Sequence, residues 1–147
     1  MSGYIAQSKT VEWATPQGLF DRLDAVWRFT VDVAADAGNA KCARFYDEAA
    51  DGLAQSWAGE RAWCNPPYGR GIGRWVEKAA QSVKADPSIV VLMLVPSRTD
   101  VAWFHDHCLH NPDCAVEFLR GRLKFGDAKV GAPFPSMLLT FRARACP

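Results

Sequence analysis

The spacing of apolar positions changes along the chain, and each spacing predicts a different element. From 72 to 85 the apolar residues recur at helical spacing on one side, and from 89 to 95 they follow one another without interruption. An uninterrupted β-branched and aliphatic run is typical of a central strand covered on both faces. The middle of the chain is therefore predicted to form a helix followed by a buried strand.

Helical spacing also follows Thr15 and Pro16. We expect the Thr15 hydroxyl to cap this helix and Pro16 to be its first residue, because proline lacks the amide hydrogen that would need a partner there. The other expected strands are 29–33, 43–46, 61–64, 115–119, 123–125 and 137–141, and the other expected helices are 53–57 and 101–109.

Strands that alternate with helices predict an α/β fold. We expect a mostly parallel sheet with antiparallel strands at its C-terminal end and helices on both faces. Ligands of such sheets bind beyond the carboxyl ends of the central strands. Asp32 and Asn65 both fall at predicted strand ends, so the pattern places them at one edge of the sheet.

Composition favours a folded globule. Of 147 residues, 49% are hydrophobic and 12% aromatic, which argues against disorder and fits one domain over residues 1–147, with residues 1–11 as a flexible arm. The longest apolar run is too short to cross a bilayer, and the first residues lack a signal-peptide pattern. We therefore expect a cytoplasmic protein that does not bind a membrane.

The cysteines and histidines raise the question of a metal site. Five cysteines without a CxxC pair are typical of a reducing compartment. A cluster near position 108 offers zinc-ligand side chains, but its spacing matches no standard zinc site, and it fits the end of an amphipathic helix better. We therefore expect no metal. The cluster consists of His105, His107, Cys108, His110 and Cys114.

The net charge of +1 indicates no global attraction to nucleic acid. Locally, Arg120, Arg122 and Lys124 alternate, which would place their charges on one face of a strand. Such a face could contact phosphates, or it could be an ordinary solvated edge that discourages aggregation. The sequence leaves both interpretations open.

The tetrapeptide Asn65-Pro66-Pro67-Tyr68 carries the most specific chemistry. The exocyclic nitrogen of adenine is a poor nucleophile, because its lone pair is delocalised into the ring. An asparagine oxygen and a backbone carbonyl can accept its two N–H groups and draw the nitrogen toward tetrahedral geometry. The prolines would stiffen the turn, and the tyrosine would stack on the base.

Together these features resemble the phage-type DNA N6-adenine methyltransferases, a short Dam-like family. The segments that carry the resemblance are Trp13-x-Thr15-Pro16, Asp32-Val33-Ala34-Ala35, Asn39-Ala40-Lys41-Cys42, Asp51-Gly52-Leu53, Asn65-Pro66-Pro67-Tyr68-Gly69, Pro96-x-Arg98-Thr99-Asp100, Trp103-Phe104-His105, Gly121-Arg122-Leu123-Lys124-Phe125 and Ala132-Pro133-Phe134-Pro135-Ser136. The resemblance implies a Rossmann-like class I methyltransferase fold that uses S-adenosylmethionine.

The resemblance also implies roles at the cofactor. Thr15 would contact the methionine carboxylate at a helix N-terminus, and Asp32 would attract the ammonium group. Asp51, with Asp47 or Glu48 as rivals, would accept hydrogen bonds from the ribose or adenine. The residues placed at the cofactor are Thr15, Pro16, Asp32, Ala34, Asp51 and Asn65, and small residues stand at 34 and 35 where the superfamily has a Gly-rich loop.

For the substrate, the resemblance implies double-stranded DNA and extrusion of the target adenine onto Tyr68, followed by direct methyl transfer. Candidate DNA contacts are Arg98, Arg120, Arg122 and Lys124. No stretch is long enough for a separate target-recognition domain, so recognition is short, lenient, borne by a loop or shared across a homodimer. The family suggests a phage or prophage protein that protects DNA from restriction in a bacterial host.

Three rival functions remain. Similar tetrapeptides occur in enzymes that methylate adenine in RNA or a glutamine side chain, although the glutamine enzymes usually retain the Gly-rich loop and carry an extra substrate domain. A non-catalytic DNA-binding protein on the same fold is the third, and the intact Asn65 and Tyr68 argue against it.

Overall fold

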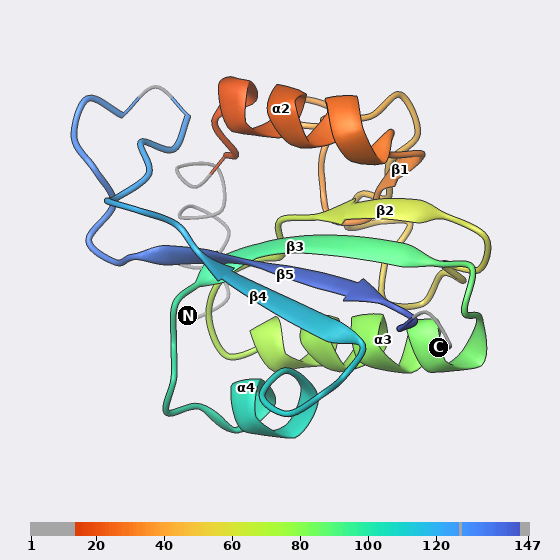
Figure 1. Cartoon of the computed structure of the whole chain (residues 1–147). Coiled ribbons are helices and arrows are strands. Elements are labelled where there is room, and N and C mark those ends of the chain that lie inside the picture. The colour runs from red at the N-terminus through yellow and green to blue at the C-terminus, as the bar shows by residue number, and fades with distance from the viewer. Residues whose placement is uncertain (1–13, 127, 145–147) are drawn as a thin grey trace.

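The computed structural model describes residues 14–126 and 128–144, which form a five-stranded sheet with helices on both faces (Figure 1). The strands are β1 (Val31–Asp32), β2 (Arg61–Cys64), β3 (Val90–Pro96), β4 (Cys114–Phe118) and β5 (Ser136–Arg142), and the helices are α2 (Gln17–Trp27), α3 (Ile72–Ala85) and α4 (Ala102–His107). The arm expected over 1–11 and the Trp13 side chain lie outside the described residues.

The sheet order is β1-β2-β3-β5-β4. The strands β1, β2 and β3 are parallel, β5 is antiparallel to β3, and β4 is antiparallel to β5. Four of the five strands therefore run in one direction, and the carboxyl ends of β1, β2 and β3 share the edge at the left of Figure 1. The expected mixed sheet with an antiparallel C-terminal part is confirmed.

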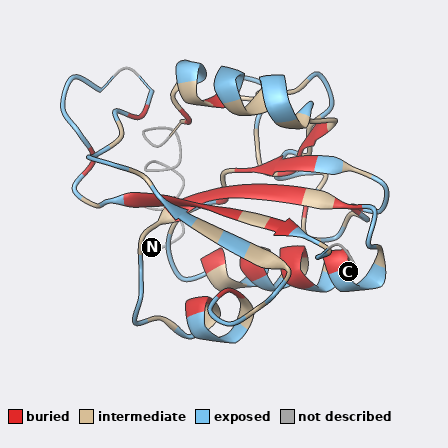
Figure 2. Cartoon of the chain, viewed as in Figure 1, coloured by how far each residue is buried: buried red, intermediate tan, exposed pale blue. Residues whose placement is uncertain are grey.

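Alternating side chains of β3 enter two separate cores, and the strand is buried along most of its length (Figure 2). Leu92 and Leu94 pack with Phe20 of α2 on one face, whereas Val91 and Met93 belong to the core on the α3 and α4 face. All four β3 side chains are at most 1% exposed. This double coverage explains the uninterrupted apolar run, because a strand buried on both faces has no polar side to present.

The strongest patterns gave the right elements. The helix expected over 72–85 and the strand expected over 61–64 have the observed bounds of α3 and β2. In α3 the buried side chains are Ile72, Val76, Ala79, Ala80 and Val83, as helical spacing requires. The weaker patterns gave three errors.

The expected helix over 53–57 is wrong, because the chain forms a turn instead. The Trp57 indole Nε1 donates to the Gly52 carbonyl at 2.9 Å and holds this turn inward. The strand over 43–46 reduces to a single bridge between Phe45 and Asp32. The strand over 123–125 is also wrong, since Leu123 lies in a loop and its carbonyl accepts from the Ala132 amide at 2.9 Å.

The start of α2 also differs from expectation. The helix begins at Gln17, Pro16 is the residue that precedes it, and no side chain caps its amide groups. Thr15 is 4% exposed, and its Oγ1 accepts a hydrogen bond from the Asn65 side chain at 3.1 Å. A long-range partner has therefore replaced the local cap. No helix among residues 14–126 and 128–144 is long and apolar enough to span a bilayer.

Gly52 marks the closest approach between the 51–54 turn and the sheet. A Cβ at this position would collide with the Val33 carbonyl oxygen and press on the Trp75 ring. We expect Gly52→Ala to lower the free energy of unfolding by about 2 kcal/mol, since backbone at the sheet must shift. Gly71→Ala is the control, because its added Cβ meets nothing within 4 Å. Chemical denaturation checks this; equal stability of both variants would contradict it.

Candidate active site

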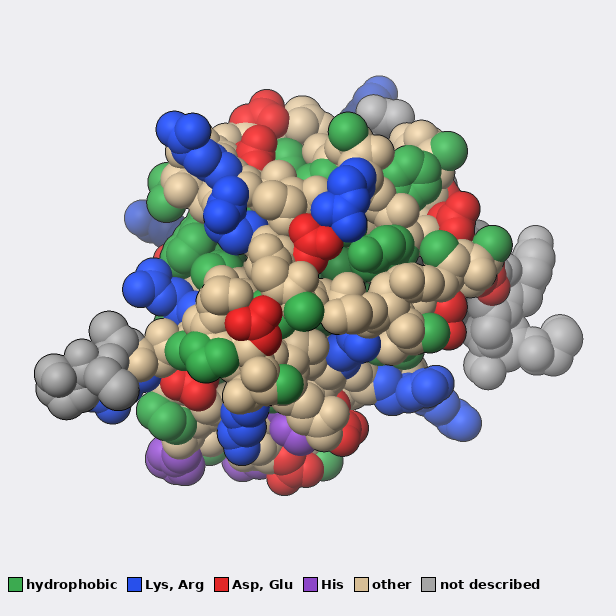
Figure 3. Space-filling model, turned by 90° about the vertical axis from the view of Figure 1, so that its right-hand side faces the viewer, with side chains coloured by type: hydrophobic (Ala, Val, Ile, Leu, Met, Phe, Trp, Pro, Cys, Tyr) green, Lys and Arg blue, Asp and Glu red, His purple; other side chains and the backbone are tan. Residues whose placement is uncertain are grey.

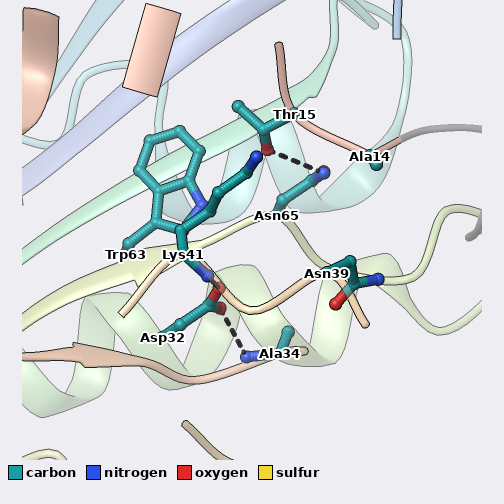
Figure 4. Close-up of a pocket in the computed structure, with 8 residues that line it drawn as sticks. All are labelled: Ala14, Thr15, Asp32, Ala34, Asn39, Lys41, Trp63 and Asn65. Carbon is teal, nitrogen blue, oxygen red and sulfur yellow. Dashed lines mark hydrogen bonds between the residues drawn. The ribbon is translucent and has the colours of Figure 1, made fainter. Parts of the chain in front are cut away.

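Polar side chains from three distant segments converge at the carboxyl edge of the sheet (Figure 4). Thr15 precedes α2, Asp32 ends β1, and Asn65 follows β2. They border a cavity of about 20 Å³ lined by Ala14, Thr15, Asp32, Ala34, Asn39, Lys41, Trp63 and Asn65. The strand-end argument thus brought Asp32 and Asn65 to the same site, as predicted.

Asp32 is a buried carboxylate with backbone partners. Its side chain is 2% exposed, its Oδ1 accepts from the Ala34 amide at 3.3 Å, and its Oδ2 accepts from the Lys41 amide at 3.0 Å. Desolvation raises the pKa of Asp32 to about 6, although these two bonds and the Lys41 charge oppose the shift. A further positive charge in the cavity would make the ionised form of this buried carboxylate less costly.

The Asn65 amide is oriented by Thr15. Asn65 Nδ2 donates to Thr15 Oγ1 at 3.1 Å, across fifty positions of sequence. With the nitrogen directed at Thr15, the amide oxygen lies on the other side of the planar group. That orientation suits an acceptor for an amino group, which is the role predicted from the tetrapeptide.

Lys41 is a site residue to which the sequence assigned no role. Its side chain extends along the cavity toward Thr15 (Figure 4). Its Nζ donates at 2.7 Å to Oε1 of Gln17, which is the first residue of α2. The first turn of α2 has neither an acidic residue nor a side-chain cap. The ammonium and the partial positive charge of the helix start therefore lie together, opposite Asp32.

Tyr68 is packed beneath the loop between β4 and β5. Its hydroxyl donates to the Leu94 carbonyl at 3.1 Å. Its ring centroid lies 6.3 Å from that of Phe125 and 5.6 Å from that of Phe134, in an edge-to-face arrangement with both rings. Burial raises the pKa of Tyr68 far above its ordinary value, so the phenol stays neutral. Of the two prolines, Pro66 is buried and the other is exposed.

The acidic candidates for a ribose contact lie outside the cavity lining. Asp51 is exposed, has a φ of 57°, and accepts from the Leu53 amide through its carboxylate. Asp47 caps a turn by accepting from the Ala50 amide at 2.8 Å. Both residues are held close to the strand that carries Asp32, because Gly52 packs against the end of β1 and the Tyr46 amide donates to the Asp32 carbonyl at 2.9 Å.

The basic candidates do not share a strand. Arg98 lies after β3 and is 3.5 Å from Asp100, with both side chains exposed. Arg120, Arg122 and Lys124 lie in the β4–β5 loop, so the expectation that strand alternation aligns them is wrong. Arg122 Nη1 donates to the Ala132 carbonyl at 3.3 Å, which gives this residue a structural contact.

Two cysteines border the segments of the candidate site, Cys42 beside Lys41 and Cys64 beside Asn65. No group of three or more His, Cys, Asp or Glu side chains could hold a metal ion in the part of the chain that the structure describes. Desolvation raises the pKa of Cys42 to about 12 and raises that of the buried Cys64 as well. Both thiols are therefore protonated at neutral pH and unreactive.

The raised pKa of Asp32 gives a stability prediction. The folded carboxyl titrates near 6 and the unfolded one near 3.8, so the penalty for ionised Asp32 is present above pH 6 and disappears as the pH falls toward 3.8. Asp32→Asn abolishes this titration. The free energy of unfolding of the variant minus that of the wild type should therefore be larger at pH 8 than at pH 4, by up to about 3 kcal/mol. Urea unfolding at the two pH values measures this difference.

The control for this comparison is Asp106→Asn, because Asp106 is exposed on α4. Its stability relative to wild type should change little between the two pH values. A flat profile for Asp32→Asn as well would show that the carboxylate is not buried as described.

Comparison with known proteins gives the family of the chain. Residues 4–142 match the family described as DNA N-6-adenine-methyltransferase (Dam). The chain is 31% identical over 94 residues to the "DNA N-6-adenine-methyltransferase" of Escherichia phage T1. The aligned segment covers 63% of this chain and 38% of the phage protein. The chain is 35% identical over 65 residues to "Putative methyltransferase YfdM" of Escherichia coli K12, which covers 39% of this chain and 70% of that protein. The chain belongs to the DNA N-6-adenine-methyltransferase (Dam) family.

Proposed function

We propose that this protein transfers a methyl group from S-adenosylmethionine to the N6 amino group of adenine in double-stranded DNA. The observation that carries the proposal is the Asn65 amide, oriented by Thr15 beside the buried Asp32 carboxylate. Membership of the Dam family supports both the reaction and the DNA substrate. A Rossmann-like class I fold, formed as one domain by the residues of this chain, is part of the same proposal.

The groups that line the cavity are complementary in charge to the amino-acid end of the cofactor. Asp32 would hold the ammonium group, and Lys41 with the uncapped start of α2 would hold the carboxylate. The described cavity of about 20 Å³ holds roughly one water. Lys41 would therefore exchange Gln17 for the carboxylate when the cofactor enters. Ala34 would allow close backbone approach, and Asp51 would face the ribose or adenine.

The reaction requires an acceptor for the amino group and a surface for the base. The cofactor supplies an electrophilic methyl group on a sulfonium sulfur. Asn65 Oδ1 and the Pro66 carbonyl would accept the two N–H groups and make the nitrogen lone pair available for in-line attack. The surplus proton would leave to water after the transfer. Protonated thiols nearby agree with a mechanism without a covalent enzyme intermediate.

Duplex DNA imposes a further requirement, because the amino nitrogen is unreachable inside the stack. The adenine would be extruded toward Tyr68, with Arg98, Arg120, Arg122 and Lys124 contacting the DNA. The competing functions, methylation of RNA adenine or of glutamine and DNA binding without turnover, are separated by sequencing methylated bases in DNA from expressing cells. If that DNA contained no N6-methyladenine, adenine in DNA would be excluded as the substrate.

Asn65→Ala should reduce methyl transfer by about 100-fold or more, because the amino-group acceptor is lost. Tritium transfer to DNA measures this, and the thermal shift with sinefungin should remain, since Asp32 and Lys41 are intact. Asn111→Ala, which removes an amide that donates to the His107 carbonyl, is the control for loss of a structural asparagine. Wild-type turnover of Asn65→Ala would exclude the mechanism.

Thr15→Val separates orientation of the amide from its presence. The valine matches threonine in shape but cannot accept from Asn65 Nδ2. Transfer should fall less than in Asn65→Ala, and the double variant should be no slower than Asn65→Ala, since both changes act on one acceptor. Additive losses would show that Thr15 acts elsewhere.

Lys41→Met should weaken binding of S-adenosylmethionine by about tenfold or more, because a charge-assisted contact to the carboxylate is lost. S-adenosylmethionine amide, which lacks that carboxylate charge, should bind the wild type and Lys41→Met with equal affinity. Lys84→Met is the control, since Lys84 is exposed at the far end of α3. Calorimetric titration measures each of these affinities. Equal affinity of Lys41→Met and Lys84→Met would remove Lys41 from the cofactor site.

A further inference from the structure

The β4–β5 loop, residues 119–135, concentrates the positive charge of the molecule. Its sequence holds four basic residues and one acidic residue, a formal charge of +3 in a chain whose total is +1. The loop extends beyond the carboxyl edge of the sheet, on the side of the start of α2 (Figure 1). At the opposite edge, Lys and Arg side chains are interspersed with acidic and apolar ones (Figure 3). A polyanion is therefore favoured at the loop.

The base of this loop is fixed to the candidate active site. The Ala132 amide donates to the Leu123 carbonyl at 2.9 Å, and the Gly126 amide donates to the Ala14 carbonyl at 2.8 Å. Phe125 is 1% exposed and packs 5.9 Å from Phe134. Both phenylalanines contact Tyr68, so the anchor of the loop and the proposed platform for the base are one aromatic cluster.

The loop also presents an aliphatic side chain to solvent. Val130 is 75% exposed, more than any other large hydrophobic side chain among the described residues. It stands between Lys129 and Gly131, and it lies inside the segment closed by the Leu123–Ala132 hydrogen bond. Exposed valine on a highly charged loop has no packing role in this structure.

We propose that Val130 is a wedge that enters the base stack of duplex DNA where the target adenine is extruded. The inference rests on the proposed function. Extrusion costs a few kcal/mol of stacking and pairing and leaves a gap, and proteins that distort duplexes commonly fill such gaps with apolar side chains. Lys129 and the other basic residues of the loop bring the phosphates close, and the anchored base sets the distance from the wedge to Tyr68.

The test compares Val130→Ser with Val26→Ser. Val26 is 73% exposed on α2, away from the loop, and therefore matches Val130 in exposure and side chain. Single-turnover methyl transfer is measured on a duplex carrying the site found by sequencing methylated DNA. The same site is also presented with the target adenine mispaired and as a single strand.

Val130→Ser should slow transfer to the paired duplex by about tenfold or more. The loss of rate should be smaller on the mispaired duplex and smallest on the single strand, because less stacking must be broken in these substrates. Val130→Ile should keep wild-type rates, and Val26→Ser should match wild type on every substrate. If Val130→Ser matches Val26→Ser on the paired duplex, or loses the same factor on all three substrates, the wedge is excluded. Absence of transfer by the wild-type protein to any of them would instead refute the proposed function.

Discussion

The buried carboxylate of Asp32 is the constraint on which the site depends. The strand β1 has only two residues, and its position is secured by the segment that folds back beside it. The Asp32 amide donates to the Arg44 carbonyl at 3.0 Å, the Tyr46 amide donates to the Asp32 carbonyl at 2.9 Å, and the carboxylate accepts from the Lys41 amide. The bonds that satisfy the carboxylate thus also bring Lys41 to the start of α2. Desolvation makes the ionised form costly, which is typical of residues retained for function.

The Thr15–Asn65 hydrogen bond joins the two halves of the site. Thr15 borders the helix start beside Lys41, and Asn65 begins the proline turn that leads to Tyr68. A shift of α2 relative to β2 would therefore change both the charged end of the cavity and the orientation of the amide. The Thr15 hydroxyl thus acts as a long-range acceptor for Asn65 and not as a local cap of α2.

Under the proposed function, the charged loop would contact the DNA, and the aromatic cluster would hold that loop against the platform for the base. Phe125 and Phe134 hold the loop against Tyr68, whereas the basic residues and Val130 face outward. An anchored loop of this kind would let a connection between two strands of the sheet contact the DNA. The proposed DNA-facing surface thus lies within the segment, residues 4–142, that matches the family.

The sequence by itself determined the sheet elements that are buried and the edge at which the polar side chains meet. Burial imposes periodicity on β2, β3 and α3, and the order of parallel strands places Asp32 and Asn65 together. Only the tertiary structure decided the partner of Thr15, the position of Lys41 and the loop conformation around Leu123. These features depend on contacts between residues far apart in sequence, and local spacing does not record which distant groups close packing will bring within hydrogen-bonding distance.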